Sequence, residues 1–230
     1  MSGLLSSLGE DRILRLQQRQ LKPAIVLTAV LMARVFMLPV VDADASWLMP
    51  LNHAVTAIAL GYMAATTRRH LEVAATLALV IVGIQVLSVL RLAPPVLDHV
   101  QAVAFAVLLV YVFVLMLRDL LVATSADAAT MLLAVNCYLL IGVLWAVFYT
   151  VTEGLAPGSF AVPGDGGGPV WKDLYYFSFV TLTTLGYGDV QPVSPLARSL
   201  AMTEAMAGVL FTGILVARLV GMVAAPRARD

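Results

Sequence analysis

Six long apolar segments run through this chain of 230 residues and constrain its fold more than any other feature. Each is long enough to cross about 30 Å of hydrocarbon as an α-helix, which takes roughly 20 residues. Helices are required because lipid offers no hydrogen-bond partners to open backbone groups. The sequence therefore predicts an all-α membrane protein with six transmembrane helices. Their approximate limits are 23–41, 48–67, 71–90, 99–122, 128–150 and 196–222.

The composition supports a lipid environment and argues against several classes of function. The chain is 61% hydrophobic and 12% charged, whereas soluble domains are about half apolar and a quarter charged. The formal net charge is zero, so no nucleic-acid partner is expected. Cys137 is the only cysteine, which excludes an intrachain disulfide and a multi-cysteine metal site. Because the sequence shows no catalytic cluster or metal-ligand spacing, we expect neither an enzyme nor a cofactor.

The basic residues predict how the chain is oriented. If six spans alternate in direction, most basic residues fall on one side, which the positive-inside rule assigns to the cytoplasm. Both termini are then cytoplasmic, in a multi-pass protein of the plasma membrane. Residues 1–22 are expected to form an amphipathic cytoplasmic segment on the membrane surface, and residues 223–230 a short cytoplasmic tail. All but two of the 14 basic residues are arginine, a bias that suggests a bacterial source.

Residues 151–195 differ from the rest of the chain. A stretch rich in glycine and proline, 154–168, predicts a flexible surface loop. The following residues, 171–183, predict a helix of about a dozen residues, too short to span a membrane. Such a re-entrant segment must be covered by protein or line water. Gly186, Gly188 and Pro192 prevent this helix from continuing.

The segment TLTTLGYGD, residues 181–189, resembles the signature of potassium channels. The resemblance extends over about residues 128–222 and implies a pore domain there, with an outer helix, a pore helix, a selectivity filter and an inner helix. It also implies a bacterial six-transmembrane member of the pore-loop ion-channel superfamily. Potassium ions would then bind the main-chain carbonyls of Thr184, Leu185, Gly186 and Tyr187, and the Thr184 hydroxyl, within a filter that ends at Gly188.

Ion chemistry explains why these residue types are needed. A potassium ion must exchange its hydration shell for protein oxygens at little net cost in free energy, and rings of backbone carbonyls achieve this. If successive carbonyls are to face one axis, some residues must take a positive φ, which glycine tolerates. We therefore expect positive φ angles at Gly186 and Gly188.

The resemblance also implies the surroundings of the filter. Tyr187 is expected to point back into an aromatic cuff and hold the diameter of the ring. Asp189 is expected at the outer mouth, and Thr183 is expected to support the filter. Leu185 replaces the usual valine of the family. Many relatives carry a carboxylate where this chain has Val180, so Asp189 lacks that partner. The cuff is predicted from Tyr175, Tyr176 and Phe177.

One copy of the signature predicts the stoichiometry. A single loop offers one carbonyl to each layer of the filter, and the ring of the family needs four. The chain is therefore expected to form a homotetramer with closed fourfold symmetry, in contact with membrane lipids and K⁺.

The last apolar segment is expected to be the inner helix. Gly208 falls where relatives have a hinge glycine, since a helix can bend at glycine. Close packing of helices through a face formed by Ala205, Gly208 and Thr212 is an equally good explanation. Helical spacing suggests that Val209, Thr212 and Val216 line the inner cavity.

The first four segments, 23–122, form a four-helix transmembrane domain that is not expected to sense voltage. A voltage sensor needs several basic residues along the fourth segment, and residues 99–122 contain only Arg118. We expect a gating charge near zero. Two further charges lie inside apolar segments. Arg34 either reaches the membrane surface or a polar groove among the first four helices, or it pairs with Glu204.

Three functions remain open on these grounds. The motif favours a potassium-selective channel that conducts passively. The alternatives are a nonselective or sodium-passing cation channel, and a transporter or non-conducting regulatory subunit.

Overall fold

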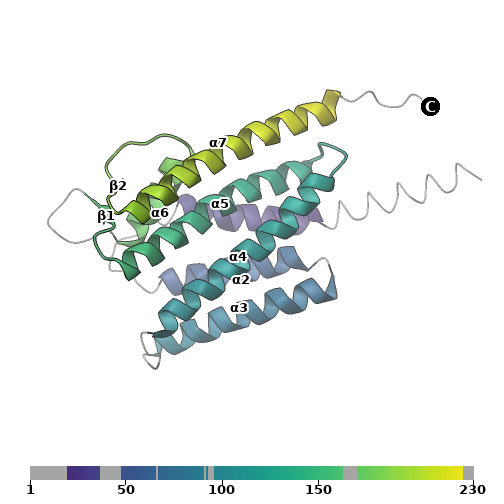
Figure 1. Ribbon diagram of the computed structural model, residues 1–230. Coiled ribbons are helices and arrows are strands. Elements are labelled where there is room, and N and C mark those ends of the chain that lie inside the picture. The colour runs from purple at the N-terminus through teal and green to yellow at the C-terminus, as the bar shows by residue number, and fades with distance from the viewer. Residues whose placement is uncertain are drawn as a thin grey trace, which may run out of the picture.

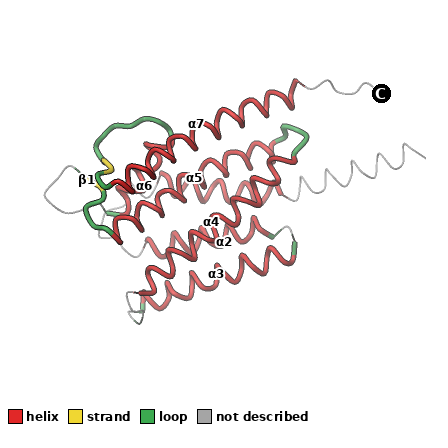
Figure 2. Tube along the Cα trace, in the orientation of Figure 1, coloured by secondary structure: helices red, strands yellow, loops and turns green. Residues whose placement is uncertain are grey.

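The structure is a computed structural model that describes residues 20–36, 48–65, 67–90, 92, 96–162 and 170–224. Most of the predicted amphipathic segment, 1–22, and most of the predicted tail, 223–230, lie outside the described residues. Within them the chain is mostly helical, as predicted (Figure 2). The helices are the first helix at 20–36, α2 Leu48–Ala64, α3 Arg68–Val89, α4 Val96–Val122, α5 Ala128–Leu155, α6 Trp171–Leu182 and α7 Pro195–Ala224.

The long helices lie side by side, and the short α6 sits at one end between α5 and α7 (Figure 1). Helix α5 is central, since it packs against α4 as well as against α6 and α7. Its start follows from the N-cap Asp127, whose side chain accepts a hydrogen bond from the Thr130 amide at 2.8 Å. Within the described part of the chain, four helices are long and apolar enough to cross a membrane. They are Arg68–Ser88, Val100–Val122, Ala128–Leu155 and Pro195–Met222.

The other two predicted spans are shorter within the described part of the chain. Residues 20–36 and α2 each form a helix of 17 residues there, so a total of six spans stays a prediction. Helix α5 is longer than predicted, because it continues past residue 150 to Leu155. The hydroxyls of Thr150 and Thr152 each donate to the carbonyl four residues earlier, at 2.8 Å. These polar side chains therefore satisfy their donors without ending the helix.

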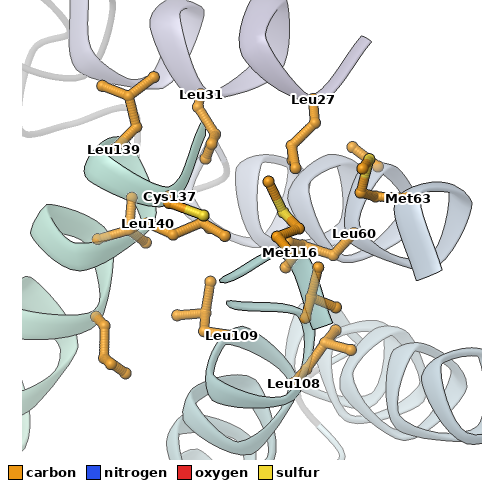
Figure 3. Close-up of a cluster of buried hydrophobic side chains, with 14 of the residues drawn as sticks. Leu27, Leu31, Leu60, Met63, Leu108, Leu109, Met116, Cys137, Leu139 and Leu140 are labelled. Atoms are coloured by element: carbon orange, nitrogen blue, oxygen red, sulfur yellow. The ribbon is translucent and has the colours of Figure 1, made fainter. Parts of the chain in front are cut away.

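A single hydrophobic core joins the first four helices to the predicted pore domain. Figure 3 shows the part of this core between the first helix, α2, α4 and α5. A polar contact crosses the same boundary: the Asn136 amide on α5 donates to the Ala24 carbonyl at 3.0 Å and accepts from the Thr28 hydroxyl at 2.9 Å. The first four helices and the predicted pore domain are thus packed together. The residues labelled in the figure are Leu27, Leu31, Leu60, Met63, Leu108, Leu109, Met116, Cys137, Leu139 and Leu140.

A small strand pair adds to the all-α fold that the sequence predicts. Strand β1, Phe160–Ala161, pairs antiparallel with β2, Gln191–Pro192. The Ser159 carbonyl also accepts from the Val193 amide at 2.8 Å, and the Glu153 carboxylate accepts from the Gly158 amide at 2.8 Å. The first part of the loop predicted as flexible is therefore held in place by hydrogen bonds, while residues 163–169 lie outside the described residues.

Candidate functional site

The segment that carries the motif is a short helix followed by an irregular loop. Helix α6 has 12 residues, about 18 Å at 1.5 Å per residue, which confirms that it is too short to span. Its start is stabilised by Asp173, whose carboxylate accepts from the Val170 amide at 2.9 Å. Thr183 is its C-cap. The loop at 184–189 follows directly, so the end of α6 determines where the predicted filter begins.

The backbone of this loop takes a positive φ at every second residue. The values are 61° at Thr184, 59° at Gly186 and 78° at Gly188. The positive φ angles expected for both glycines are confirmed. Thr184 was not expected, because a β-branched residue rarely adopts this conformation. The only feature of the sequence that indicates a positive φ at Thr184 is its position two residues before Gly186. Such an alternating backbone suits a chain whose successive carbonyls must face one axis.

Hydrogen bonds attach the loop to the end of α6. The Val180 carbonyl accepts from the Leu185 amide at 2.9 Å, and the Thr181 carbonyl accepts from the Thr184 amide at 3.0 Å. The Tyr138 hydroxyl on α5 donates to the Leu182 carbonyl at 3.3 Å. These bonds hold the inner end of the loop against both α6 and α5. Tyr138 carried no signal in the sequence, since it lies in an ordinary apolar run.

Two glycines allow α6 to approach its neighbours closely. A Cβ on Gly142 of α5 would lie 2.7 Å from Cζ of Phe179, and a Cβ on Gly208 of α7 would lie 2.4 Å from the Leu182 carbonyl oxygen. Helix α7 continues without interruption through Gly208. The structure therefore supports the close-packing explanation for Gly208, and a hinge at this position stays a prediction.

A buried carboxylate connects the three helices around the loop. Glu204 of α7 is fully buried. Its Oε2 accepts from the Tyr149 hydroxyl of α5 at 2.5 Å, and its Oε1 lies 2.5 Å from the Ser178 hydroxyl of α6. Ser178 also lies 2.7 Å from the Gly142 carbonyl oxygen. Glu204 does not pair with Arg34, as one alternative proposed, because its carboxylate is occupied by these two hydroxyls.

Replacing Glu204 by leucine is expected to destabilise the protein, whereas glutamine is expected to be tolerated. Leucine leaves the buried Tyr149 hydroxyl without its acceptor, which costs about 1–3 kcal/mol. For a chain of this size that lowers the melting temperature by roughly 2–10 °C. Glutamine retains a carbonyl oxygen for Tyr149 and an amide for Ser178. Thermal unfolding in detergent gives the melting temperature of both variants. If Glu204→Leu melts at the same temperature as the unmodified protein, the carboxylate does not hold these helices together.

The predicted filter residues lie together on the surface of the single chain. All residues from Thr183 to Asp189 are exposed, and the side chain of Tyr187 is 68% exposed. Of the three residues predicted for the aromatic cuff, Tyr176 lies near Tyr187, and no ring contact joins Tyr187 to the other two among the described residues. Tyr175 packs against Phe179, and Phe177 packs against Tyr149 and Phe160. These rings are therefore occupied by contacts within α6 and with α5 and β1.

Asp189 has a partner that the sequence did not reveal. Its carboxylate lies near enough to the Tyr176 hydroxyl for the two groups to interact. Partial burial and this carboxylate together raise the pKa of Tyr176. The Gln191 amide donates to the Gly188 carbonyl at 2.8 Å. The outer end of the loop is thus supported although Val180 cannot bond to Asp189.

The residues predicted to line an inner cavity lie on one exposed side of α7. Val209 is 57% exposed and Val216 is 54% exposed. The Thr212 hydroxyl donates to the Gly208 carbonyl at 2.9 Å. Their place on the helix is compatible with a cavity lining, which stays a prediction.

Comparison with known proteins identifies the part of the chain that contains this site. Residues 137–225 match the model of a family described as ion channel. The chain is 35% identical over 82 residues to the inward rectifier potassium channel Kirbac3.1 of Paramagnetospirillum magnetotacticum, covering 34% of this chain and 24% of that protein. It is 37% identical over 67 residues to the two pore potassium channel c of Oryza sativa subsp. japonica, covering 29% of this chain and 14% of that protein.

Residues 137–225, which match the ion-channel family, contain most of α5 together with α6, the loop and α7. The chain spans about a quarter of the first relative and about a seventh of the second. No solved structure matches the chain. Together with the four apolar helices, these matches indicate a multi-pass membrane protein whose residues 137–225 are similar to ion channels, potassium channels among them.

Proposed function

We propose that the chain is one subunit of a potassium-selective channel, through which K⁺ passes passively along Thr184 to Gly188. The observation that carries the proposal is the backbone of the loop, with a positive φ at residues 184, 186 and 188 directly after a short helix. Carbonyls of Thr184, Leu185, Gly186 and Tyr187, with the Thr184 hydroxyl, would replace the water around the ion. The match of residues 137–225 to the ion-channel family, and the similarity of part of the chain to potassium channels, support the same assignment.

A homotetramer would complete the site. One loop supplies one carbonyl to each layer of the filter, and four copies around an axis supply a ring. The surfaces that other copies would cover are uncovered in the single chain. In the single chain, only 6% of the apolar stretch of α7 is buried, compared with 61% of that of α5. Tyr187 would then pack against the pore helix of the adjacent subunit, which explains why its side chain is exposed in the single chain.

The proposed arrangement has six spans in the plasma membrane of a bacterium, with both termini in the cytoplasm. Residues 23–122 form the four-helix domain and residues 128–222 the pore domain. Helix α4 occupies the place of a voltage-sensing helix. Its residues from 99 to 122 contain a single basic side chain, Arg118, which lies beside Asp119 at 3.7 Å and is 68% exposed. We therefore propose a channel that voltage does not gate steeply.

Rubidium uptake into liposomes that contain the purified protein tests the proposal. Uptake is expected to be rapid and unaffected by excess external Na⁺, because the carbonyl ring favours the larger, more easily dehydrated ion. Strong competition by Na⁺ would identify a nonselective cation channel, and absence of uptake would favour a transporter or a regulatory subunit. Recordings from the same preparation in a planar bilayer are expected to show no steep dependence of opening on voltage.

A further inference from the structure

A cavity with a buried arginine lies between the first helix, α2, α4, α5 and α6. Its volume is about 160 Å³, roughly ten times the ~15 Å³ that a single water needs. The exposed Thr150 on its rim indicates that it opens to the surface of the chain. Five helices contribute to it. The polar and aromatic residues that line it include Arg34, His53, Gln101, Thr150, Trp171 and Tyr175.

Arg34 is buried without a carboxylate partner among the described side chains. It is 3% exposed, and its guanidinium carbon lies 5.5 Å from the centre of the Phe105 ring and 5.2 Å from that of Tyr175. Among the described residues, its Nη1 donates one long hydrogen bond to the Thr56 hydroxyl, at 3.4 Å. Aromatic rings offset part of the cost of burying a cation. A buried charge nevertheless calls for an opposite charge.

Two buried donors at this cavity also lack acceptors. Neither Nε of Arg34 nor the hydroxyl of Tyr175 has a hydrogen-bond partner of acceptable geometry among the described residues. Tyr175 is also 3% exposed. Buried polar groups are nearly always hydrogen-bonded, so two unpaired donors beside one cavity point to an acceptor within it. A guanidinium binds phosphate and carboxylate groups with two parallel hydrogen bonds.

We propose that this cavity binds an anionic group, a phosphate or a carboxylate, through Arg34. The hydroxyl of Tyr175 and the amide of Gln101 are available as further donors to it. Such a group belongs either to the headgroup of an anionic lipid or to a free small anion. Both sources share the chemistry that the cavity recognises, and both fit a cavity that opens to the surface.

The site touches the helix that supports the loop. Trp171 and Tyr175 belong to the first two turns of α6, and the predicted filter follows the other end of this helix. An anion bound to Arg34 therefore stabilises the position of α6 against the first helix and α4. An effect of this anion on conduction rests on the proposed function, whereas the binding of the anion to Arg34 does not.

Thermal unfolding of the purified full chain in a neutral detergent tests the proposal without measuring conduction. The ligands added are phosphatidylglycerol, phosphatidylcholine and inorganic phosphate. Phosphatidylglycerol is expected to raise the melting temperature by about 5 °C more than phosphatidylcholine does. Arg34→Gln is expected to lose this difference. The exposed Arg69 on α3 supplies the matched control, and Arg69→Gln is expected to retain the difference.

The outcomes separate a binding site from a merely structural role. If Arg34 only joins helices through its aromatic contacts, Arg34→Gln lowers the melting temperature equally with and without anionic lipid, and the proposal is wrong. An equal response to inorganic phosphate supports the site and identifies a free anion as its ligand. If Arg34→Gln cannot be purified, Gln101→Leu retains the charge and is expected to weaken the response. A full response in that variant would contradict the proposed cavity.

Discussion

Gly186→Ala is expected to reduce rubidium uptake at least ~100-fold, because alanine is strained where the loop has a φ of 59°. The left-handed conformation costs an ordinary residue about 1–2 kcal/mol. In a ring of four copies the total strain would be about 4–8 kcal/mol. A 100-fold loss of uptake corresponds to about 2.7 kcal/mol. The loop is therefore expected to leave the geometry that binds dehydrated K⁺. Uptake into liposomes at matched protein content measures the effect.

Gly154→Ala is the matched control for this substitution. Gly154 lies in α5, its φ is not positive, and no other atom lies within 4 Å of an added Cβ. Uptake by Gly154→Ala is expected to equal that of the unmodified protein. Undiminished uptake by Gly186→Ala would mean that ions do not pass along this loop, and the assignment of Thr184 to Gly188 would fail.

Gly208→Ala is expected to destabilise the protein, because the added methyl group would lie 2.4 Å from the Leu182 carbonyl oxygen. This oxygen belongs to the backbone at the end of α6, so either α6 or α7 must shift. Overpacking of this kind costs about 1–3 kcal/mol, which lowers the melting temperature by roughly 2–10 °C for a chain of this size. The loop that begins two residues later shifts with α6, so uptake is expected to fall as well.

Gly213→Ala provides a control in the same helix. Gly213 lies five residues further along α7, and an added Cβ there has no neighbour within 4 Å. Alanine is expected to leave the melting temperature unchanged or to raise it slightly, since alanine favours the helix more than glycine does. If Gly208→Ala melts like Gly213→Ala and alters only the fraction of time that the channel is open, the hinge explanation holds in place of close packing.

The local structure of the site could be predicted from the sequence because it depends on neighbouring residues. The apolar runs identified α3, α4, α5 and α7, and the motif identified the short α6 and the positive φ of Gly186 and Gly188. The positive φ of Thr184 could not be predicted, because threonine has no intrinsic preference for a positive φ. The strand pair β1–β2 was missed because two residues are too few for an alternating pattern.

Contacts between distant residues could not be predicted, for a physical reason. Membrane helices are apolar on all sides, so periodicity does not show which side faces the protein interior. The partners of Glu204 depend on the rotation of α5, α6 and α7 about their axes. The cavity around Arg34 likewise depends on how five helices cross. The sequence left three alternatives for Arg34, namely the membrane surface, a polar groove and a pairing with Glu204, and only the packed structure separates them.

The core shared by the first four helices and α5 makes the two halves of the chain mechanically inseparable. Lipid could replace the leucines of the first helix, but it offers nothing to the Asn136 amide, which bonds to Thr28 and Ala24. A movement of the outer helices in the plane of the membrane would therefore pull on the helix against which α6 rests. The position of the first four helices is thus linked through α5 to α6 and to the loop at 184–189.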